Sequence, residues 1–142
     1  TKREHRFFKA LPGDWGDGYE NVTILCSVEI QRRADDRIPA FLKLPVRHKG
    51  ILCEPLLEKL VLDAYLKTGE IAQVLCGGEQ GADARVCDFA WVLELMNQCV
   101  NCGVTFRFLR TGTFFRKGNR IYRIAEEEQE EQARRAGVDY TP

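Results

Sequence analysis

Three short apolar segments of nearly the same sequence recur along the chain, and each one leads to a glutamate. They are ILCSVE at 24–29, ILCE at 51–54 and VLCGGE at 74–79. Their cysteines lie 27 and 23 residues apart, which is about the length of one strand, one helix and two short loops. The repeat therefore predicts β-strands that alternate with α-helices.

The two stretches between these strands have the spacing of amphipathic helices. Apolar residues recur at helical intervals over 34–42 and again over 57–65, and Gly69 provides an end signal for the second stretch. Pro39 disfavours helical angles at the residue before it, so the first stretch is either one helix or two short turns.

A third helix and a fourth strand complete the pattern. Asp88 can cap a helix over 89–100 that Gly103 ends, and an apolar strand follows over 104–109. Alternating strands and helices with nearly continuous apolar strands predict an α/β fold with a parallel sheet whose successive strands are neighbours. These four βα units are either half of an eight-stranded (β/α) barrel or the core of a small open sheet.

The C-terminal part departs from the βα pattern. Residues 114–124 read as a β-hairpin, and the polar segment 126–136 suits an exposed helix with charge pairs such as Glu130 with Arg134. With 142 residues there is room for a single domain, 1–142, in which about 1–112 form the βα core and about 113–142 form the hairpin and the polar tail.

Charge and hydropathy exclude several classes of protein. Hydrophobic residues make up 44% of the chain and charged residues 30%, which is typical of a packed soluble domain. Lys plus Arg and Asp plus Glu number 21 each, so no global positive field favours nucleic acid or an anionic membrane. No apolar run approaches the ~20 residues that a bilayer requires. The first residue, Thr1, is not Met, which we take to indicate a processed or truncated chain.

The six cysteines indicate buried thiols and a reducing, cytoplasmic location. Cys26, Cys53 and Cys76 follow apolar runs, where reduced cysteine packs as a small hydrophobic residue. Cys99 and Cys102 form a C-x-x-C pair, but they lie at the C-terminal end of a helix, where the helix dipole disfavours a thiolate. The chain has two distant histidines and no metal-ligand spacing, so no metal site is expected.

The glutamates that follow the three repeated strands are the main candidates for a functional site. Side chains alternate across a strand, so we place the three cysteines on the helix side and Glu29, Glu54 and Glu79 on the other side, at the C-terminal ends of the strands. Ligands bind at that edge in parallel α/β folds. Three carboxylates at neighbouring strand ends need a cation, a basic side chain or a ligand amine among them.

Two interpretations of these glutamates remain open. They form one joint site, or each one caps a helix or pairs locally with an arginine. The candidate positive partners are Lys2, Arg3, Arg37, Arg85 and Arg110.

Small and flexible residues accompany these strand ends. Ser27 precedes the first glutamate, and Gly77 and Gly78 precede the third. The two glycines would let the backbone approach a phosphate, a carboxylate or a sugar closely, although a simple tight turn explains them equally well.

A series of blocks covers nearly the whole chain, at 21–29, 34–39, 53–57, 77–79, 84–85 and 99–112. In these blocks the chain resembles an uncharacterised family of phage and bacterial proteins, a domain of unknown function that carries a three-cysteine, radical-SAM-like motif. The chain is similar to the C-terminal half of that family. Gln80 stands where the family tends to have serine, and Leu109 stands where it tends to have lysine.

The resemblance implies a radical-SAM-type barrel whose cluster-binding half is not in this sequence. An iron–sulfur cluster and S-adenosylmethionine are implied for a full-length relative, whereas this chain lacks C-x-x-x-C-x-x-C spacing and is expected to hold no cofactor. The expected function is to supply acidic and glycine-rich strand ends to a small-molecule ligand site, without catalysis by this chain alone.

Two other classes of function stay open. The first is a non-catalytic binding or assembly module of phage or mobile-element origin. The second is nucleic-acid binding through the hairpin, where Arg116, Lys117, Arg120 and Arg123 alternate with aromatic residues, although an ordinary amphipathic hairpin is the simpler interpretation. Open strand edges predict either self-association, pairing with a missing N-terminal half, or an edge covered by the hairpin and tail.

Overall fold

The computed structural model describes residues 1–142, apart from the side chains of residues 4 and 5. The elements in chain order are η1 (Glu4–Ala10), β1 (Thr23–Ser27), α1 (Gln31–Leu42), β2 (His48–Cys53), α2 (Asp63–Leu66), β3 (Ile71–Gly77), β4 (Cys87–Asp88), α3 (Phe89–Cys102), β5 (Thr105–Arg110), β6 (Phe114–Lys117), β7 (Arg120–Arg123), η2 (Glu126–Glu128) and α4 (Gln129–Arg135).

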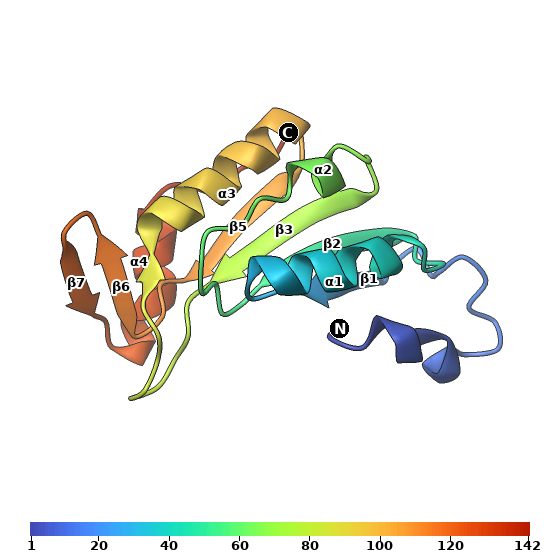
Figure 1. Cartoon of the computed structure of the whole chain (residues 1–142), viewed down its shortest axis with the longest axis horizontal. Helices are drawn as coiled ribbons and strands as arrows, with labels where there is room; N and C mark the ends of the chain where they lie inside the picture. The colour runs from blue at the N-terminus through green and yellow to red at the C-terminus, as the bar shows by residue number, and fades with distance from the viewer.

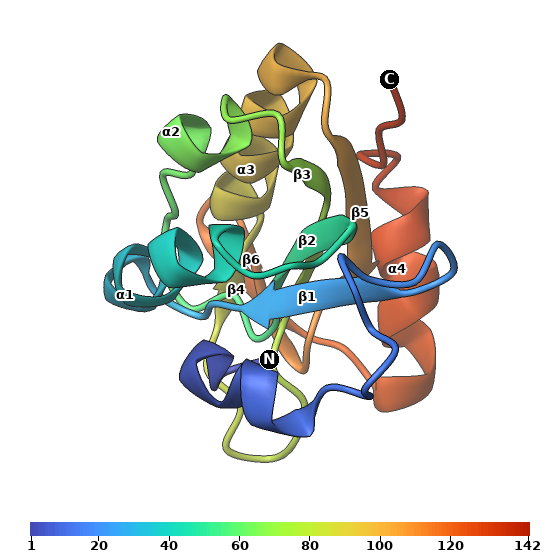
Figure 2. The ribbon, with the colours of Figure 1, turned by 90° about the vertical axis from the view of Figure 1, so that its right-hand side faces the viewer.

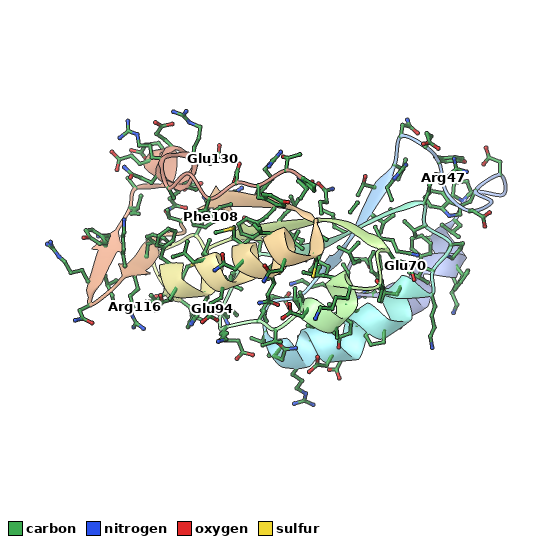
Figure 3. All side chains as sticks on the ribbon, turned by 90° about the horizontal axis from the view of Figure 1, so that it is seen from above. Arg47, Glu70, Glu94, Phe108, Arg116 and Glu130 are labelled. Carbon is green, nitrogen blue, oxygen red and sulfur yellow. The ribbon has the colours of Figure 1, made fainter. Side chains whose placement is uncertain are left out.

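The predicted parallel sheet is confirmed. Its order is β1-β2-β3-β5, and all three pairings are parallel. The helices α1, α2 and α3 lie on one side of this sheet, and α4 lies against β5 on the other side (Figures 1 and 2). Figure 3 shows the same layers from above, with Glu94 of α3 and Glu130 of α4 on opposite sides of Phe108.

The cysteines of the three repeats lie in the core between the sheet and the helices. Cys26, Cys53 and Cys76 are fully buried, and Cys99 of α3 is buried with them. None of the six cysteines, all of which lie in the described part of the chain, forms a disulfide. Burial raises the pKa of the Cys53 and Cys76 thiols well above the ordinary value for cysteine, so both are neutral packing groups.

The first and third predicted helices form as single helices. α1 runs through Pro39 without a break, and it buries Ala34, Ile38 and Phe41. In α3 the Asp88 carboxylate accepts a hydrogen bond from the Ala90 N–H at 2.9 Å. Gly103 ends α3 with a φ of 64°, a left-handed conformation that glycine adopts at little cost.

The predicted helix over 57–65 is wrong, because only Asp63–Leu66 is helical. Side chains from two other helices bond the backbone that would otherwise form the earlier turns. Gln98 accepts from the Leu62 N–H at 2.6 Å and donates to the Leu60 carbonyl at 2.8 Å, and Gln31 accepts from the Val61 N–H at 2.7 Å. Leu56, Leu60 and Leu62 are thereby buried from an irregular segment.

The C-terminal hairpin is confirmed, but it does not cover the edge of the main sheet. β6 and β7 pair antiparallel, and β6 also pairs with the two-residue strand β4 to form a second sheet. The edge of β5 is met by the tail, where Tyr140 and Phe106 exchange backbone hydrogen bonds of 2.9 Å. The tail helix is not exposed all round as predicted, since Gln129 and Ala133 are buried.

No helix in the described part of the chain is long and apolar enough to span a membrane.

Candidate functional site

The carboxyl ends of the four parallel strands lie at one edge of the sheet (Figure 1). Glu54 directly follows β2, Gly77 is the last residue of β3, and Arg110 is the last residue of β5. This arrangement follows from the parallel order, because adjacent strands that run in the same direction end together.

Glu54 and Arg110 form an ion pair across the end of β3. The Arg110 Nε lies 2.9 Å from the Glu54 Oε1, and the side chains are 28% and 26% exposed, respectively. The two atoms are buried but poorly aligned, so neither forms a hydrogen bond to a described residue. A buried, misaligned pair of opposite charges has bonding capacity that a ligand can use.

Gly77 makes room for this ion pair. A Cβ at Gly77 would lie 2.6 Å from the Glu54 Oε1 and 3.3 Å from the Arg110 Cγ. Any other residue at this position would therefore push the carboxylate away. Cys76 faces the helices, so a Cβ at the next residue, Gly77, would point to the opposite face of the sheet. The ion pair therefore lies over the face that points away from α1, α2 and α3, as the alternation of side chains predicts for Glu54.

Gly78 serves the packing of the strand ends as well as the cleft. A Cβ there would lie 2.2 Å from the Thr111 carbonyl oxygen, and the Gly78 N–H donates to the Arg110 carbonyl at 3.0 Å. Protein backbone thus occupies the space beside this glycine and uses its N–H group. The requirement for glycine comes from the contact between the ends of β3 and β5.

Glu79 has the most complete set of partners of the three glutamates. The Arg85 Nε and Nη2 each donate to its carboxylate at 2.8 Å, and the Arg85 backbone N–H donates at 2.8 Å. The bonds from the Arg85 side chain and backbone lower the pKa of Glu79 to about 2. This carboxylate is ionised at neutral pH.

Glu29 lies in a separate cluster at the end of β1. It pairs with Lys2 and with the Arg37 Nη1, which lies 3.1 Å away and also donates to the Ser27 carbonyl at 2.6 Å. Burial alone would raise the pKa of Glu29, but Lys2 and Arg37 outweigh it and lower the pKa. Arg3 is exposed and donates its backbone N–H to the Thr1 hydroxyl at 3.0 Å.

A small cleft of about 220 Å³ opens at the ends of β2, β3 and β5. Its lining residues are Glu54, Pro55, Gly78, Glu79, Gln80 and Arg110. Two of the three predicted glutamates therefore share one cleft, whereas Glu29, Ser27, Lys2, Arg3 and Gly77 do not line it.

Two lining residues, Gln80 and Pro55, and Glu130 beside Arg110 were not among the predicted site residues. Gln80 accepts a hydrogen bond of 2.7 Å from the Arg110 Nη1, and the Glu130 carboxylate of α4 lies 4.0 Å from the Arg110 Nη2. Pro55 follows Glu54 through a cis peptide bond. Gln80 and Pro55 could be suspected from their places beside the glutamates, but Glu130 reaches the site only through the packing of α4 on β5.

The cysteines of this chain do not fit an iron–sulfur cluster. No group of three or more His, Cys, Asp or Glu side chains in the described residues could hold a metal ion. Burial raises the pKa of Cys87 and of Cys99 to about 12, so these thiols resist the ionisation that metal binding requires. Cys99 of the C-x-x-C pair is thus a buried core residue.

What the fold and site define is an α/β domain with a cleft lined by glutamates and an arginine at the carboxyl edge of a parallel sheet. The chain belongs to the family described as "Protein of unknown function (DUF5131)", which it matches over residues 1–140. Neither a curated protein nor a solved structure matches the chain.

Proposed function

We propose that this chain is the C-terminal half of a (β/α) barrel protein of radical-SAM type, and that its strand ends supply part of a ligand site. The observation that carries the proposal is the cleft at which Glu54, Glu79 and Arg110 meet, at the carboxyl ends of adjacent parallel strands. Ligand sites of (β/α) barrels are built at this end of the strands. The chain contributes binding groups and does not catalyse a reaction alone.

The face of the sheet that points away from α1, α2 and α3 supports a barrel. Leu25, Leu52 and Leu75 alternate with the buried cysteines along their strands and are only half-buried. Leu52 and Leu75 are direct neighbours in the register of β2 and β3. Large aliphatic side chains on this face are what fills the interior of a closed (β/α) barrel.

The outer edge of β1 also supports a larger sheet. The Thr1 amino group donates to the Leu25 carbonyl, and the Thr1 carbonyl accepts from the Ser27 N–H at 2.9 Å. This alternation is the pattern of a parallel pair, in which one residue bonds the two residues that flank its partner. Thr1 thus bonds the free edge of β1 in the way that a residue of a further parallel strand would.

The charges around the cleft favour a ligand that carries an amine. Glu54 and Glu130 bring two negative charges to Arg110, and Glu79 adds a third carboxylate to the cleft. Arg85 binds Glu79 from an exposed position, with 63% of its side chain accessible. A ligand ammonium that approaches Glu54 would gain the hydrogen bond that the misaligned Arg110 Nε does not make.

The test is a thermal-shift comparison of three probes of similar length: cadaverine, L-lysine and glutarate. We expect the two amines to raise the Tm and glutarate to leave it unchanged. Glu54→Gln should abolish the increase because it removes the carboxylate that faces the cleft. The same variant should change the Tm of the ligand-free protein by less than the increase that the amines produce, since relief of carboxylate repulsion offsets the lost ion pair.

Glu70→Gln is the matched control. Glu70 pairs with Lys49 at 2.7 Å and lies just before β3, at the opposite edge of the sheet (Figure 3). The Glu70→Gln protein should show the full increase in Tm with the amines. Stabilisation by glutarate alone, or an equal loss of response in both variants, would contradict the proposal.

The alternative function is a non-catalytic binding or assembly module of phage or mobile-element origin. The observation that favours it is that Glu29, Glu54 and Glu79 each have an arginine partner from this chain, so the edge is neutralised without a ligand. If none of the three probes shifts the Tm, this alternative becomes the better account of the chain.

A further inference from the structure

The C-terminal hairpin concentrates positive charge that the rest of the molecule does not neutralise. Residues 114–124 contain four basic residues and no acidic residue. Arg116 pairs with Asp88 at 3.5 Å. Among the described side chains, no carboxylate lies within ion-pair distance of Lys117, Arg120 or Arg123, whereas the strand-end arginines Arg37, Arg85 and Arg110 all have partners.

One face of this hairpin combines the cations with aromatic rings. Phe115 pairs with Tyr122 and Lys117 pairs with Arg120 in the register of β6 and β7, so these four side chains share a face. Tyr122 is 42% exposed. The Arg120 guanidinium lies 5.5 Å from the centre of the Tyr122 ring.

This face forms one wall of a second cleft, about 450 Å³ in volume, between the hairpin and α4. Phe89, Phe115 and Tyr122 supply its aromatic surface, Lys117, Arg123 and Arg135 its positive charges, and Glu128 its single acidic group. The Lys117 ammonium lies 5.5 Å from the centre of the Phe89 ring. Figure 3 labels Arg116 on the hairpin and Glu130 on α4, the two elements that enclose the cleft.

We propose that this cleft binds a nucleotide unit, with the base stacked on Tyr122 and the phosphate held by Lys117 and Arg120, the two cations that share a face of the hairpin with Tyr122. Three aromatic rings beside cations without carboxylate partners match a planar base attached to a phosphate. The volume lies within the range of small-ligand sites. The balanced charge of the whole chain does not oppose this, because salt screening restricts the attraction to groups within about 10 Å.

The site is separate from the cleft at the strand ends. No residue lines both clefts among those given for them. The proposal therefore does not depend on the proposed function of the strand ends, and either one can fail without the other.

Binding is measured by fluorescence anisotropy with a labelled single strand of about ten thymidines, a length that spans one typical single-strand site. We expect Tyr122→Leu to weaken binding about tenfold or more through the loss of stacking. Lys117→Gln combined with Arg120→Gln should reduce the slope of log K against log salt by about 1.4, which corresponds to two phosphate contacts. Both variants change exposed side chains, so circular dichroism should show an unchanged fold.

Two controls remove a positive charge and an aromatic ring at exposed positions elsewhere. Arg32→Gln removes an exposed arginine from α1, and Phe8→Leu removes an exposed ring from η1. Both should bind the strand as the unaltered protein does. Competition with thymidine monophosphate identifies the source of the ligand: effective competition indicates a free nucleotide, and weak competition indicates a nucleic-acid strand.

Three results would overturn the proposal. The first is no binding of the strand or of thymidine monophosphate up to about 1 mM, since non-specific single-site affinities already lie below this concentration. The second is a Tyr122→Leu protein that binds the strand as tightly as the unaltered protein does. The third is an equal loss of binding in the control variants.

Discussion

The three strand-end glutamates differ in how firmly each carboxylate is held. Glu79 receives three hydrogen bonds from Arg85, and Glu29 lies between two cations. Glu54 has one ion pair whose atoms are poorly aligned. Glu54 is therefore the carboxylate that a ligand can engage with the least loss of existing bonds.

The Glu79–Arg85 pair predicts a dependence of stability on pH. The folded pKa of Glu79 is about 2, below the ordinary value, so the pair stabilises the fold above the unfolded pKa and this contribution disappears as the pH falls through 2. Glu79→Gln should therefore lower the Tm at about pH 6, and the difference from the unaltered protein should vanish near pH 2. The effect will be small because Arg85 is exposed.

Thermal unfolding followed by circular dichroism over this pH range measures the effect. Glu127→Gln, which changes an exposed carboxylate without an ion-pair partner among the described residues, is the control and should show no such trend. A constant Tm difference between the Glu79→Gln protein and the unaltered protein at every pH would contradict the assignment.

Substitutions at Cys53 measure how much a polar atom in the core lowers the free energy of unfolding. Cys53→Ser should reduce the free energy of unfolding by about 1–3 kcal/mol, the range for a buried hydroxyl without an assured partner. Cys53→Ala should cost less. Urea denaturation measures both, and Cys102→Ser, at a half-buried position, should change stability by less than about 0.5 kcal/mol. Equal stability of the two Cys53 variants would show that the hydroxyl is satisfied.

At the scale of elements, the segment between β2 and α2 depends on side chains from distant helices. The amide of Gln98 bonds the backbone of both Leu60 and Leu62, and that of Gln31 bonds Val61 twice, accepting from its N–H and donating to its carbonyl at 3.1 Å. These bonds replace those that a longer α2 would have made within itself.

Gln98→Ala should therefore destabilise the protein by about 1–3 kcal/mol, because it leaves a buried N–H and a carbonyl without partners. Asn97→Ala is the control on the same helix, since Asn97 is exposed and one residue away. Urea denaturation gives both values, and hydrogen exchange should show faster exchange of the Leu62 N–H in the Gln98→Ala protein. Equal effects of the two substitutions would mean that Gln98 does not hold this segment.

For the whole molecule, the two faces of the main sheet are covered unequally. Three helices pack on the cysteine side, whereas α4 covers the other side only next to β5 (Figures 1 and 2). The half-buried leucines of β1, β2 and β3 lie on that other side. A closed barrel or a second copy would bury them.

We predict that the chain self-associates through this face at micromolar concentration. Leu75→Glu should shift the protein toward the monomer, because a charge on this face opposes apolar contact. Analytical ultracentrifugation measures the shift, and Val61→Glu, at a position that is 53% exposed outside the sheet, should leave the association unchanged. A monodisperse monomer of the unaltered protein would defeat the prediction and weaken the case for half a barrel.

The parallel order of the strands was predictable because it depends on local patterns. The βα period requires crossovers long enough for a helix, and alternation along each strand sets which side chains face the helices. α3 was predictable for the same reason, since Asp88 and Gly103 lie within the segments whose geometry they determine.

Only the tertiary structure decided which charges meet at the site. Glu130 reaches Arg110 because α4 packs on β5, Glu29 lies outside the cleft because Lys2 and Arg37 hold it at the end of β1, and β4 joins the hairpin in a second sheet. These contacts join residues that are far apart in the chain, or depend on small rotations of long side chains. Periodicity determines the face and the edge on which a residue lies, but the partner it meets there depends on how the elements pack.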